Sequence, residues 1–471
     1  MTHRLIEFFS QRESYKHKRR KKQGLTTTIL FVARKPKFKS PTGMHDILET
    51  DHRYFQKIYD VVRSIAAFYN FDKIETPILE DTELFSRGIG LTTDVVQKEM
   101  FSFRTKGGDY LTLRPEGTAP VVRAYIENGM QNLPKPVKLW YFGPYFRYER
   151  PQAGRFRQFW QFGFEIIGEE GAIVDAQITQ IIYDILRTLK LKDIVIEVNS
   201  IGASCCRPYY KKLLTNYFRS RANSLCANCR RKLKENVLRI LDCKEEKCQR
   251  VTANGPQIID HLCQSCHRHF KEFLEFLDEL ELPYHLNPYL VRGLDYYTRT
   301  VFEFFGQISR KEKGEEEEKD ELQLPVRLSL AGGGRYDGLI KILGGKDMPA
   351  TGVAVGIERV VRLMKERSVR LSVPARPRIF LIQLGSLAKR KSLKLMEEFR
   401  NAKIPILESL GRNSLRAQLK MADKNKVDYS LILGQKEALE GRIIIRQMTT
   451  GTQQSVKLER IVKEMKKRLK K

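Results

Sequence analysis

The stretch FRYERPQAGRFRQFWQFGFE, residues 146–165, mixes basic and aromatic side chains around two carboxylates. Its arginines are Arg147, Arg150, Arg155 and Arg157. Guanidinium groups bind phosphate oxygens with a planar pair of donors, and aromatic rings stack on nucleobases. Two kinds of site fit this composition: a surface for single-stranded nucleic acid, or one wall of a nucleotide pocket. The neighbouring segments must decide between them.

All eight cysteines lie in one window, 205–266, and four of them form two CxxC pairs. These four are Cys226, Cys229, Cys263 and Cys266. The spacing suits thiolate ligands of a structural zinc ion, so we expect these four as candidate ligands. Further ligands on offer are Cys243, Cys248 and His267. Against zinc, roughly thirty residues separate the pairs, and small buried cysteines are common. Disulfides are disfavoured in a reducing compartment.

The glycine-rich stretch AGGGRYDGL, residues 331–339, invites interpretation as a phosphate loop. It lacks the Lys-Ser/Thr that ends a P-loop, and its glycines do not have the spacing of the dinucleotide fingerprint. Three consecutive glycines more often indicate that other atoms pack closely on the backbone.

The apolar residues predict the elements that must position these side chains. Amphipathic helices are expected over 51–69 and 175–190, where apolar residues recur every three to four positions. The strand candidates are 71–80, 109–114, 138–148, 158–167, 194–198 and 290–305. They succeed one another through hairpins rather than βαβ units, which favours an antiparallel sheet. A strand and then a helix are expected in GVAVGIERVVRLM, and the cysteine-bearing segment 203–283 has a helical pattern typical of an insertion.

A change of pattern follows the linker 371–378, which carries Pro374 and Pro377. The order predicted after it is βαβαββα: strand 379–384, a helix to about Ala402, a short strand, a helix near 414–424, strands YSLILG and RIIIR, and a final basic helix. This order indicates a separate small domain with a mixed sheet over 376–471.

The net charge of +29 is concentrated at the two ends of the chain. Residues 1–39 carry +10 and residues 376–471 carry +15, which leaves only +4 for the rest. Strongly basic ends favour a polyanionic partner, with nucleic acid as the first candidate. For the run HKRRKK, residues 17–22, a solvated tail is an equal alternative. The charged run 309–321 is interpreted as a solvated hairpin loop.

The apolar content sets the expected compartment. No run of eighteen apolar residues predicts a membrane span, and no apolar segment near the start predicts a secretory signal. We therefore expect a cytoplasmic protein without a membrane partner, built from two or three domains because 471 residues exceed one core.

Taken together, several segments in their observed order resemble histidyl-tRNA synthetase, a family of class II aminoacyl-tRNA synthetases. PILE (77–80) is similar to motif 1, residues 146–165 to motif 2, and GIER (356–359) to motif 3. TLRPEGTA (112–119) accompanies them, and RGLDYY and AGGGRYDG resemble the two histidine-specific signatures. The resemblance extends from Ser40 to the C-terminus, and agreement of all these segments by chance is very improbable.

The resemblance implies an α/β (α+β) fold with the antiparallel class II sheet flanked by helices. It divides the chain into a basic extension without packed structure (1–39), a catalytic core (40–372) with a helical insertion (about 203–283), and a mixed α/β anticodon-binding domain (376–471). The implied partners are ATP, L-histidine and tRNA(His), with Mg²⁺ accompanying ATP. A homodimer is implied by motif 1.

The family's reaction is attack of the histidine carboxylate on the α-phosphorus of ATP. Charge that builds on the phosphate is stabilised by preorganised cations. By resemblance, Arg147 and Arg292 are the catalytic residues and hold the α-phosphate from opposite sides. The resemblance assigns ATP to Arg147, Glu149, Arg155, Phe159 and Arg359. It assigns histidine to Glu116, Gly117, Thr118, Arg147, Gln161, Glu165, Arg292, Tyr296 and Tyr297, with Glu165 and Tyr297 facing the imidazole.

Three positions in motif 2 depart from the pattern of bacterial relatives: Tyr148, Ala153 and Trp160. Two rival interpretations remain in view. One is a non-catalytic paralogue that serves as a regulatory subunit in histidine biosynthesis, and the other is an RNA-binding scaffold. The presence of Arg147, Arg292 and Arg359 and of a basic C-terminal domain favours the enzyme.

Overall fold

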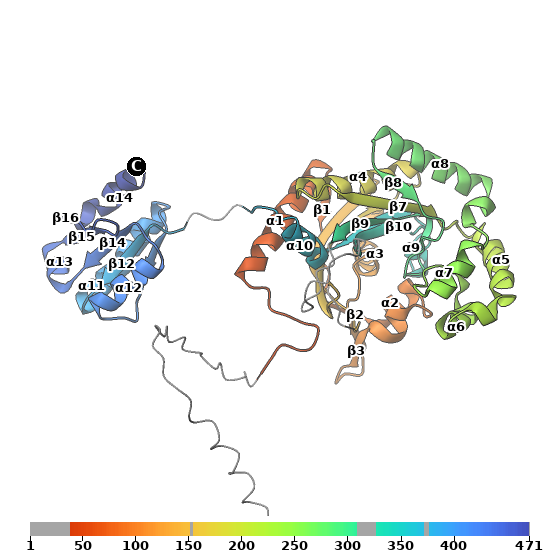
Figure 1. The fold of residues 1–471 in the computed structure, drawn as a ribbon, viewed down its shortest axis with the longest axis horizontal. Coiled ribbons are helices and arrows are strands. Elements are labelled where there is room, and N and C mark those ends of the chain that lie inside the picture. Colours follow the sequence, from red (N-terminus) through yellow and green to blue (C-terminus); the bar gives the residue numbers. More distant parts are fainter. Residues whose placement is uncertain (1–37, 151–153, 309–325, 372–375, 471) are drawn as a thin grey trace, which may run out of the picture. The chain divides into compact units, whose positions relative to one another are not determined.

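The computed structural model describes residues 38–150, 154–308, 326–371 and 376–470. The chain forms two compact units, and their boundary in the sequence lies between Val369 and Arg370 (Figure 1). Several sequence-based expectations lie outside the described ranges: most of the basic extension with its HKRRKK run, Ala153, the charged run 309–321 and Pro374. Within these ranges, no helix is both long and apolar enough to cross a bilayer.

The first unit is built on a sheet with the strand order β1-β5-β6-β11-β10-β9-β7-β8 among the described residues. These strands are β1 (Asp72–Lys73), β5 (Val137–Phe146), β6 (Gln158–Ile167), β11 (Ala350–Gly356), β10 (Val326–Arg335), β9 (Thr298–Ile308), β7 (Ile194–Ser200) and β8 (Tyr284–Leu286). The strands from β5 to β7 pair antiparallel, and only the short outer strands β1 and β8 run parallel to their neighbours. The predicted antiparallel sheet is thus confirmed, with a mixed edge on each side.

Helices cover this sheet. Those of the first unit outside the insertion are α1 (Glu49–Phe68), α2 (Thr82–Ile89), α3 (Thr118–Glu127), α4 (Ala172–Thr188), α9 (Leu339–Ile342) and α10 (Ile357–Glu366). The first and fourth confirm the helices predicted from periodicity. Helix α1 packs against α4 and α10, and α10 packs on the central strands. Single turns are η1 (Val95–Glu99) and η2 (Met130–Asn132).

The predicted strand 71–80 is wrong, because the segment divides between two sheets. Strand β1 pairs with β5, whereas β2 (Leu79–Asp81) joins a small sheet with β4 (Tyr110–Leu113) and β3 (Phe101–Arg104). Pro77 lies between the two strands, where its missing N–H removes no ladder bond. The predicted strand 290–305 begins only at Thr298, and residues 290–297 are irregular.

The cysteine-bearing segment connects β7 to β8, which lie side by side and run parallel. Parallel neighbours need a crossover connection, and here that crossover is helical. Its helices are α5 (Arg207–Arg219), α6 (Ala227–Glu235), α7 (Glu246–Ala253) and α8 (Gln264–Glu279), with single turns η3 (Ala222–Ser224), η4 (Val237–Ile240) and η5 (Ile258–His261). The predicted helical character is confirmed.

The second unit has a sheet of its own in the order β13-β12-β14-β15-β16. Its strands are β12 (Ile379–Gln383), β13 (Ile406–Glu408), β14 (Tyr429–Leu433), β15 (Arg442–Gln447) and β16 (Gln453–Lys457). Its helices are α11 (Ser386–Asn401), α12 (Leu415–Lys424), α13 (Gln435–Glu440) and α14 (Ile461–Leu469), with a turn η6 (Leu458–Arg460).

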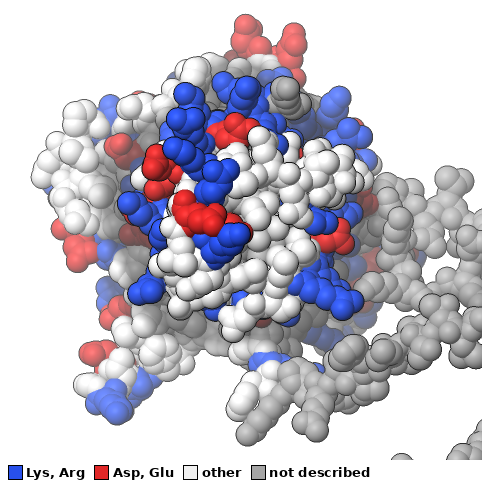
Figure 2. Space-filling view, turned by 90° about the vertical axis from the view of Figure 1, so that its left-hand side faces the viewer, with Lys and Arg blue, Asp and Glu red and all other residues white. Residues whose placement is uncertain are grey.

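The predicted order βαβαββα lacks α13 and β16. The helix is only six residues long, and the strand QQSVK is polar and lies exposed at the sheet edge, so neither has a clear apolar period. The unit buries a separate apolar core around Leu381, Leu431 and Phe399. Lys and Arg side chains, interspersed with acidic ones, are spread over the face of this unit shown in Figure 2.

A buried ion network joins the sheet of the first unit to its helices. Asp175 of α4 accepts hydrogen bonds from Arg335 of β10 at 3.1 Å and contacts His269 of α8 at 2.8 Å. Asp175 and Arg335 are fully buried. Burial opposes the charged form of Asp175, but Arg335 and His269 outweigh it and hold the carboxyl pKa below its ordinary value. This network ties the last helix of the insertion to the sheet of the first unit.

We predict that Asp175→Asn lowers the free energy of unfolding of the first unit by about 3 kcal/mol, because Arg335 and His269 lose the buried counter-charge between them. Asp337, which is partly exposed and 3.2 Å from Arg335, offsets only part of this loss. Denaturant unfolding at neutral pH measures the loss. The control is Glu275→Gln on α8, which removes an exposed ion pair with Lys271 and should cost under about 1 kcal/mol. Equal losses in the two variants would contradict the role of the network.

Candidate active site

The β5–β6 hairpin forms one wall of a pocket because side chains alternate along β6. Phe162, Phe164 and Ile166 are fully buried, and Phe164 makes an edge contact with Phe71. The odd-numbered residues of the strand point the other way, so Phe159 and Gln161 line a cavity of about 210 Å³. A period of two therefore sorts the basic-aromatic stretch into a core face and a pocket face.

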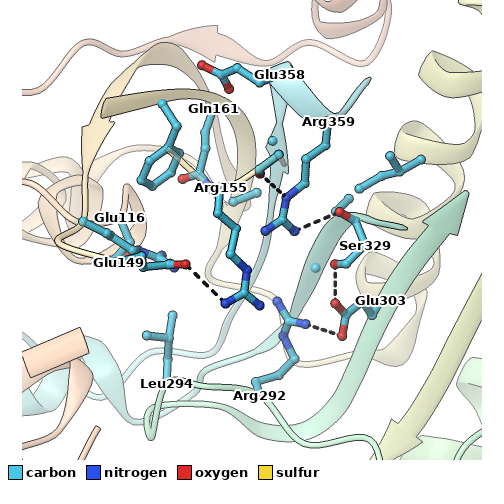
Figure 3. A pocket seen from close by; sticks show the side chains of 18 of the residues that line it. Glu116, Glu149, Arg155, Gln161, Arg292, Leu294, Glu303, Ser329, Glu358 and Arg359 are labelled. Carbon is cyan, nitrogen blue, oxygen red and sulfur yellow. Dashed lines mark hydrogen bonds and ion pairs between the residues drawn. The ribbon is translucent and has the colours of Figure 1, made fainter. Parts of the chain in front are cut away.

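Four arginines from three segments of the chain line this cavity: Arg147, Arg155, Arg292 and Arg359. Figure 3 shows the last three pointing into it. Glu149 lies between the first two, with its carboxylate oxygens 3.8 Å from Arg147 and 3.5 Å from Arg155. Arg147 also donates to the carbonyl oxygen of Pro115 at 2.8 Å, and its guanidinium lies 5.5 Å from the centre of the Phe159 ring. The cations are thus fixed in place by neighbouring protein groups.

In Figure 3 the Arg292 side chain reaches into the cavity from below and extends toward Arg155, which comes from above, with Glu303 beside it. Its Nη1 contacts the Glu303 carboxylate at 2.8 Å, and its buried Nε has no hydrogen-bond partner among the described residues. Burial favours the neutral guanidinium, but Glu303 prevails and the pKa of Arg292 is raised. Arg292 therefore stays charged with part of its donor capacity unused.

The glycine run of β10 makes room for this arginine. A Cβ on Gly332 would lie 1.9 Å from Nη2 of Arg292, and a Cβ on Gly333 would lie 2.3 Å from the carbonyl oxygen of Gly352. A side chain at Gly333 would clash with the backbone, and one at Gly332 would have to displace the Arg292 guanidinium. The motif is thus explained by close packing on the backbone, as its sequence indicates, and the group that packs there is the Arg292 guanidinium.

Arg359 begins on α10 and reaches over the edge of β10. It donates to the carbonyl oxygens of Ser329 at 2.9 Å and Gly154 at 3.2 Å. Burial lowers its pKa. Arg359 therefore lines the pocket with two of its N–H donors already bound to main-chain oxygens.

Two buried carboxylates mark the inner end of the cavity. Glu116 stands at the start of α3 and accepts hydrogen bonds from the main-chain N–H groups of Thr118 at 2.7 Å and Ala119 at 2.8 Å. These are free donors of a helix N-terminus, which favour a carboxylate there. Burial nevertheless raises the pKa of Glu116. A Cβ on Gly117 would meet the Tyr141 ring at 2.5 Å, so this turn requires glycine.

Glu165 lies behind the pocket wall and is fully buried. Its carboxylate accepts hydrogen bonds from the hydroxyls of Tyr336 at 2.6 Å, Thr118 at 2.9 Å and Tyr141 at 3.3 Å. Burial raises the pKa of Glu165 to about 8, and the three hydroxyls only partly offset this. At neutral pH the group is thus largely protonated in the folded chain.

The remaining residues that the resemblance assigns to histidine lie close together. Tyr296 and Tyr297 are buried with their rings 4.6 Å apart, and the Tyr296 hydroxyl is 3.4 Å from Glu116. The side-chain oxygen of Gln161 is buried and has no partner among the described residues, so it offers an acceptor to a ligand. All the assigned residues line the cavity except Gly117 and Glu165, which stand directly behind it.

A family model described as histidyl-tRNA synthetase matches residues 43–360. A histidine–tRNA ligase of Dehalococcoides mccartyi is 43% identical over 92% of this chain and all of that protein. One of Halothermothrix orenii is 43% identical over 91% of this chain and 99% of that protein. The chain belongs to the histidyl-tRNA synthetase family.

A solved member of the family, the apo enzyme of S. aureus, has a TM-score of 0.72 to this chain at 32% identity. It covers 91% of this chain, which in turn covers 99% of it. A second model, described as an anticodon binding domain, matches residues 378–468. Because the curated ligases align along both units, the regulatory paralogue is not favoured.

Sequence reasoning missed several residues of this family site. Glu358, next to Arg359, accepts hydrogen bonds from the main-chain N–H of Trp160 at 2.8 Å, and burial raises its pKa to about 7. Glu303, Ser329 and Tyr336 lie on or beside strands whose alternation could have revealed them. Tyr148, one of the three residues that differ from the motif 2 pattern, is half exposed. The Arg157 guanidinium lies 3.7 Å from the centre of its ring.

The four candidate zinc ligands do not come together in a single group. Cys226 and Cys229 lie with Cys243 and Cys248, whereas Cys263 and Cys266 lie with Cys205 and Cys206. None of the eight lines the inner cavity. The sequence could not pair them because the partners come from different helices and turns.

The raised pKa of Glu165 predicts a pH dependence of stability. Between its ordinary value of 4.5 and about 8, the folded chain keeps a proton that the unfolded chain releases. The free energy of unfolding should therefore fall by about 1.4 kcal/mol per pH unit over this window on account of Glu165.

The test compares Glu165→Gln with the unmodified chain by denaturant unfolding at pH 5, 6, 7 and 8. The variant keeps a neutral amide, so its stability relative to the unmodified chain should improve steadily as pH rises. A constant difference between Glu165→Gln and the unmodified chain would contradict the prediction.

Proposed function

We propose that this chain activates L-histidine with ATP to histidyl-adenylate and then transfers the histidyl group to tRNA(His). In the first step, a carboxylate oxygen of histidine forms a bond to the α-phosphorus, and the bond to pyrophosphate breaks. In the second step, a terminal ribose hydroxyl of the tRNA attacks the carbonyl carbon and AMP leaves. Membership of the family supports this proposal, and the layout of the pocket gives it a physical basis.

The observation that carries the proposal is that Arg147 and Arg292, which come from distant segments of the chain, line one cavity. An α-phosphate between them would meet guanidinium groups from two sides as negative charge builds on its oxygens. Preorganised cations lower the barrier because they need no rearrangement during the reaction. The buried, unpartnered Nε of Arg292 supports such a role.

The assignment of the remaining residues follows the chemistry of the two ends of the pocket. At the outer end, Arg155 would bind the γ-phosphate, while Phe159 and Arg359 would lie on the two faces of adenine, with Glu149 at its amino group. At the inner end, Glu116, Thr118 and Gln161 would hold the amino group and backbone of histidine.

The inner end also sets the choice of amino acid. A pocket built to hydrogen-bond its substrate rejects apolar analogues strongly, because its polar groups would otherwise lose their partners. Tyr297 would face the imidazole directly, with Tyr296 beside it. Glu165 would act from behind through the Thr118 hydroxyl, which it holds at 2.9 Å.

Mg²⁺ is the expected companion of ATP. It binds through one or two carboxylates, several waters and substrate phosphates rather than a closed protein cage. Glu149 and Glu303 fit this ligand set, because both line the pocket beside the arginines. When bound, the ion would neutralise charge on the phosphates. Any zinc would be structural, since the cysteines lie outside the inner cavity.

The second unit is proposed to bind the anticodon of tRNA(His). Residues 376–471 carry 24 Lys and Arg against 9 Asp and Glu, and the charged face in Figure 2 would attract phosphate. A homodimer is also proposed. Ile78, Leu79, Phe103 and Tyr110 of the small sheet expose large apolar side chains, which a second copy would cover. The proposed location is the cytoplasm.

The decisive experiment is pyrophosphate exchange into ATP, measured with purified protein in the absence of tRNA. Exchange should depend on histidine, and the other amino acids should support little of it. Exchange that is absent, or equal for all amino acids, would overturn the proposed activity. Charging of tRNA(His) by the same preparation then tests the second step.

The role of Arg292 predicts the behaviour of two glycine variants. Gly332→Ala should displace the guanidinium and lower the exchange kcat by about 100-fold or more, as should Arg292→Ala. The matched control is Gly338→Ala in the same motif, whose Cβ would meet no atom within 4 Å. Loss confined to the histidine KM in Arg292→Ala would count against a role in the transition state.

A further inference from the structure

The eight cysteines of the insertion form two compact groups of four. In each group the sulfur atoms all lie within 4.8 Å of one another. We define the root cluster as Cys205, Cys206, Cys263 and Cys266, and the distal cluster as Cys226, Cys229, Cys243 and Cys248. We propose that each cluster binds one zinc ion through four thiolates, so that the chain holds two structural zinc ions.

The sulfur separations fit a single tetrahedral ion. Four sulfurs placed about 2.3 Å from zinc lie roughly 3.8 Å apart along each edge of the tetrahedron. In the root cluster, Cys205 lies 3.3 Å from Cys263, 3.5 Å from Cys206 and 3.6 Å from Cys266. In the distal cluster, Cys226 lies 4.0 Å from Cys243. Disulfide sulfurs lie about 2.05 Å apart, so these are not disulfides.

The local backbone suits thiolates in both clusters. Each CxxC pair opens a helix, with Cys226 as the N-cap of α6 and Cys263 as the N-cap of α8. A helix N-terminus favours a negatively charged sulfur. Main-chain N–H groups also point at sulfur: Cys263 donates to Cys206 at 3.0 Å, and Cys226 donates to Cys248 at 3.2 Å.

The two clusters do different structural work. The root cluster joins the turn before α5 to the start of α8, and so closes a loop of more than fifty residues. α8 is in turn anchored to the catalytic sheet through His269 and Asp175. The distal cluster lies within this loop in the sequence. It holds the start of α6 against the segment from Cys243 to α7. This part has a small core around Leu214, Phe218 and Leu225, and a small core needs a covalent or metal staple.

One cysteine of the distal cluster lines a cavity that the active-site arginines also line. Cys243 lies on a second cavity, of about 1040 Å³, together with Arg147, Arg155 and Arg292. Its neighbours Asp242 and Lys244 line the same cavity. A zinc ion in the distal cluster would therefore fix the segment that faces the active-site arginines from the insertion.

The test measures the metal content of the full chain, purified under reducing conditions without a chelator. Elemental analysis should give two zinc ions per chain, and X-ray absorption should give an average of four sulfur ligands at about 2.3 Å. Zinc below half an ion per chain, iron in its place, or nitrogen and oxygen ligands would overturn the proposal. These measurements need no variant, so a failure to fold cannot obscure them.

Variants then separate the clusters. Cys226→Ser and Cys263→Ser should each lower the zinc content from two ions to one. The matched controls change residues inside the two CxxC pairs, Asn228→Ala and Ser265→Ala, and should keep both ions. A cysteine variant that retains both ions would overturn the site at its cluster. Histidine-dependent exchange, measured in parallel, reports on the activity independently of the metal content.

Discussion

The first unit depends on holding four guanidinium groups around one small cavity. Like charges at this spacing repel, and the cost grows as water is excluded. The protein meets this constraint with carboxylates and carbonyl oxygens. Glu149 serves Arg147 and Arg155, Glu303 serves Arg292, and main-chain oxygens serve Arg359. An anion that enters the cavity finds cations already in position.

The inner end of the cavity holds two carboxyl groups whose charged forms are disfavoured by burial. Glu116 and Glu165 are both buried and have raised pKa values, yet each is surrounded by donors. The main-chain N–H groups at Glu116 can only donate, so they favour its charged form. The three hydroxyls around Glu165 can donate or accept, so they can serve either form of its carboxyl group. The outer end of the pocket is therefore fixed by charge, whereas hydrogen bonds fix the inner end.

The sequence was most informative where a side-chain period or a motif acted locally. It predicted α1, α4 and β6 closely, and it correctly explained the glycine run by close packing. It failed where long-range pairing decides the outcome. Residues 71–80 divide between two sheets, because β1 pairs with β5 whereas β2 pairs with β4. The cysteines of each group come from different helices and turns, which no local sequence pattern relates. The hydrogen bond from Tyr336 to Glu165 was likewise hidden, since the two residues are 171 positions apart in the sequence.

The anchoring of α8 changes how the insertion relates to the rest of the fold. Counted along the sequence, α8 lies inside the segment between β7 and β8, but through His269 it belongs to the same buried network as Asp175 and Arg335. A lineage or an engineer that exchanges this lobe for another therefore has a natural cut just before α8, rather than at β8. Only the helices from α5 to α7 form an exchangeable module, and α8 stays behind as part of the scaffold.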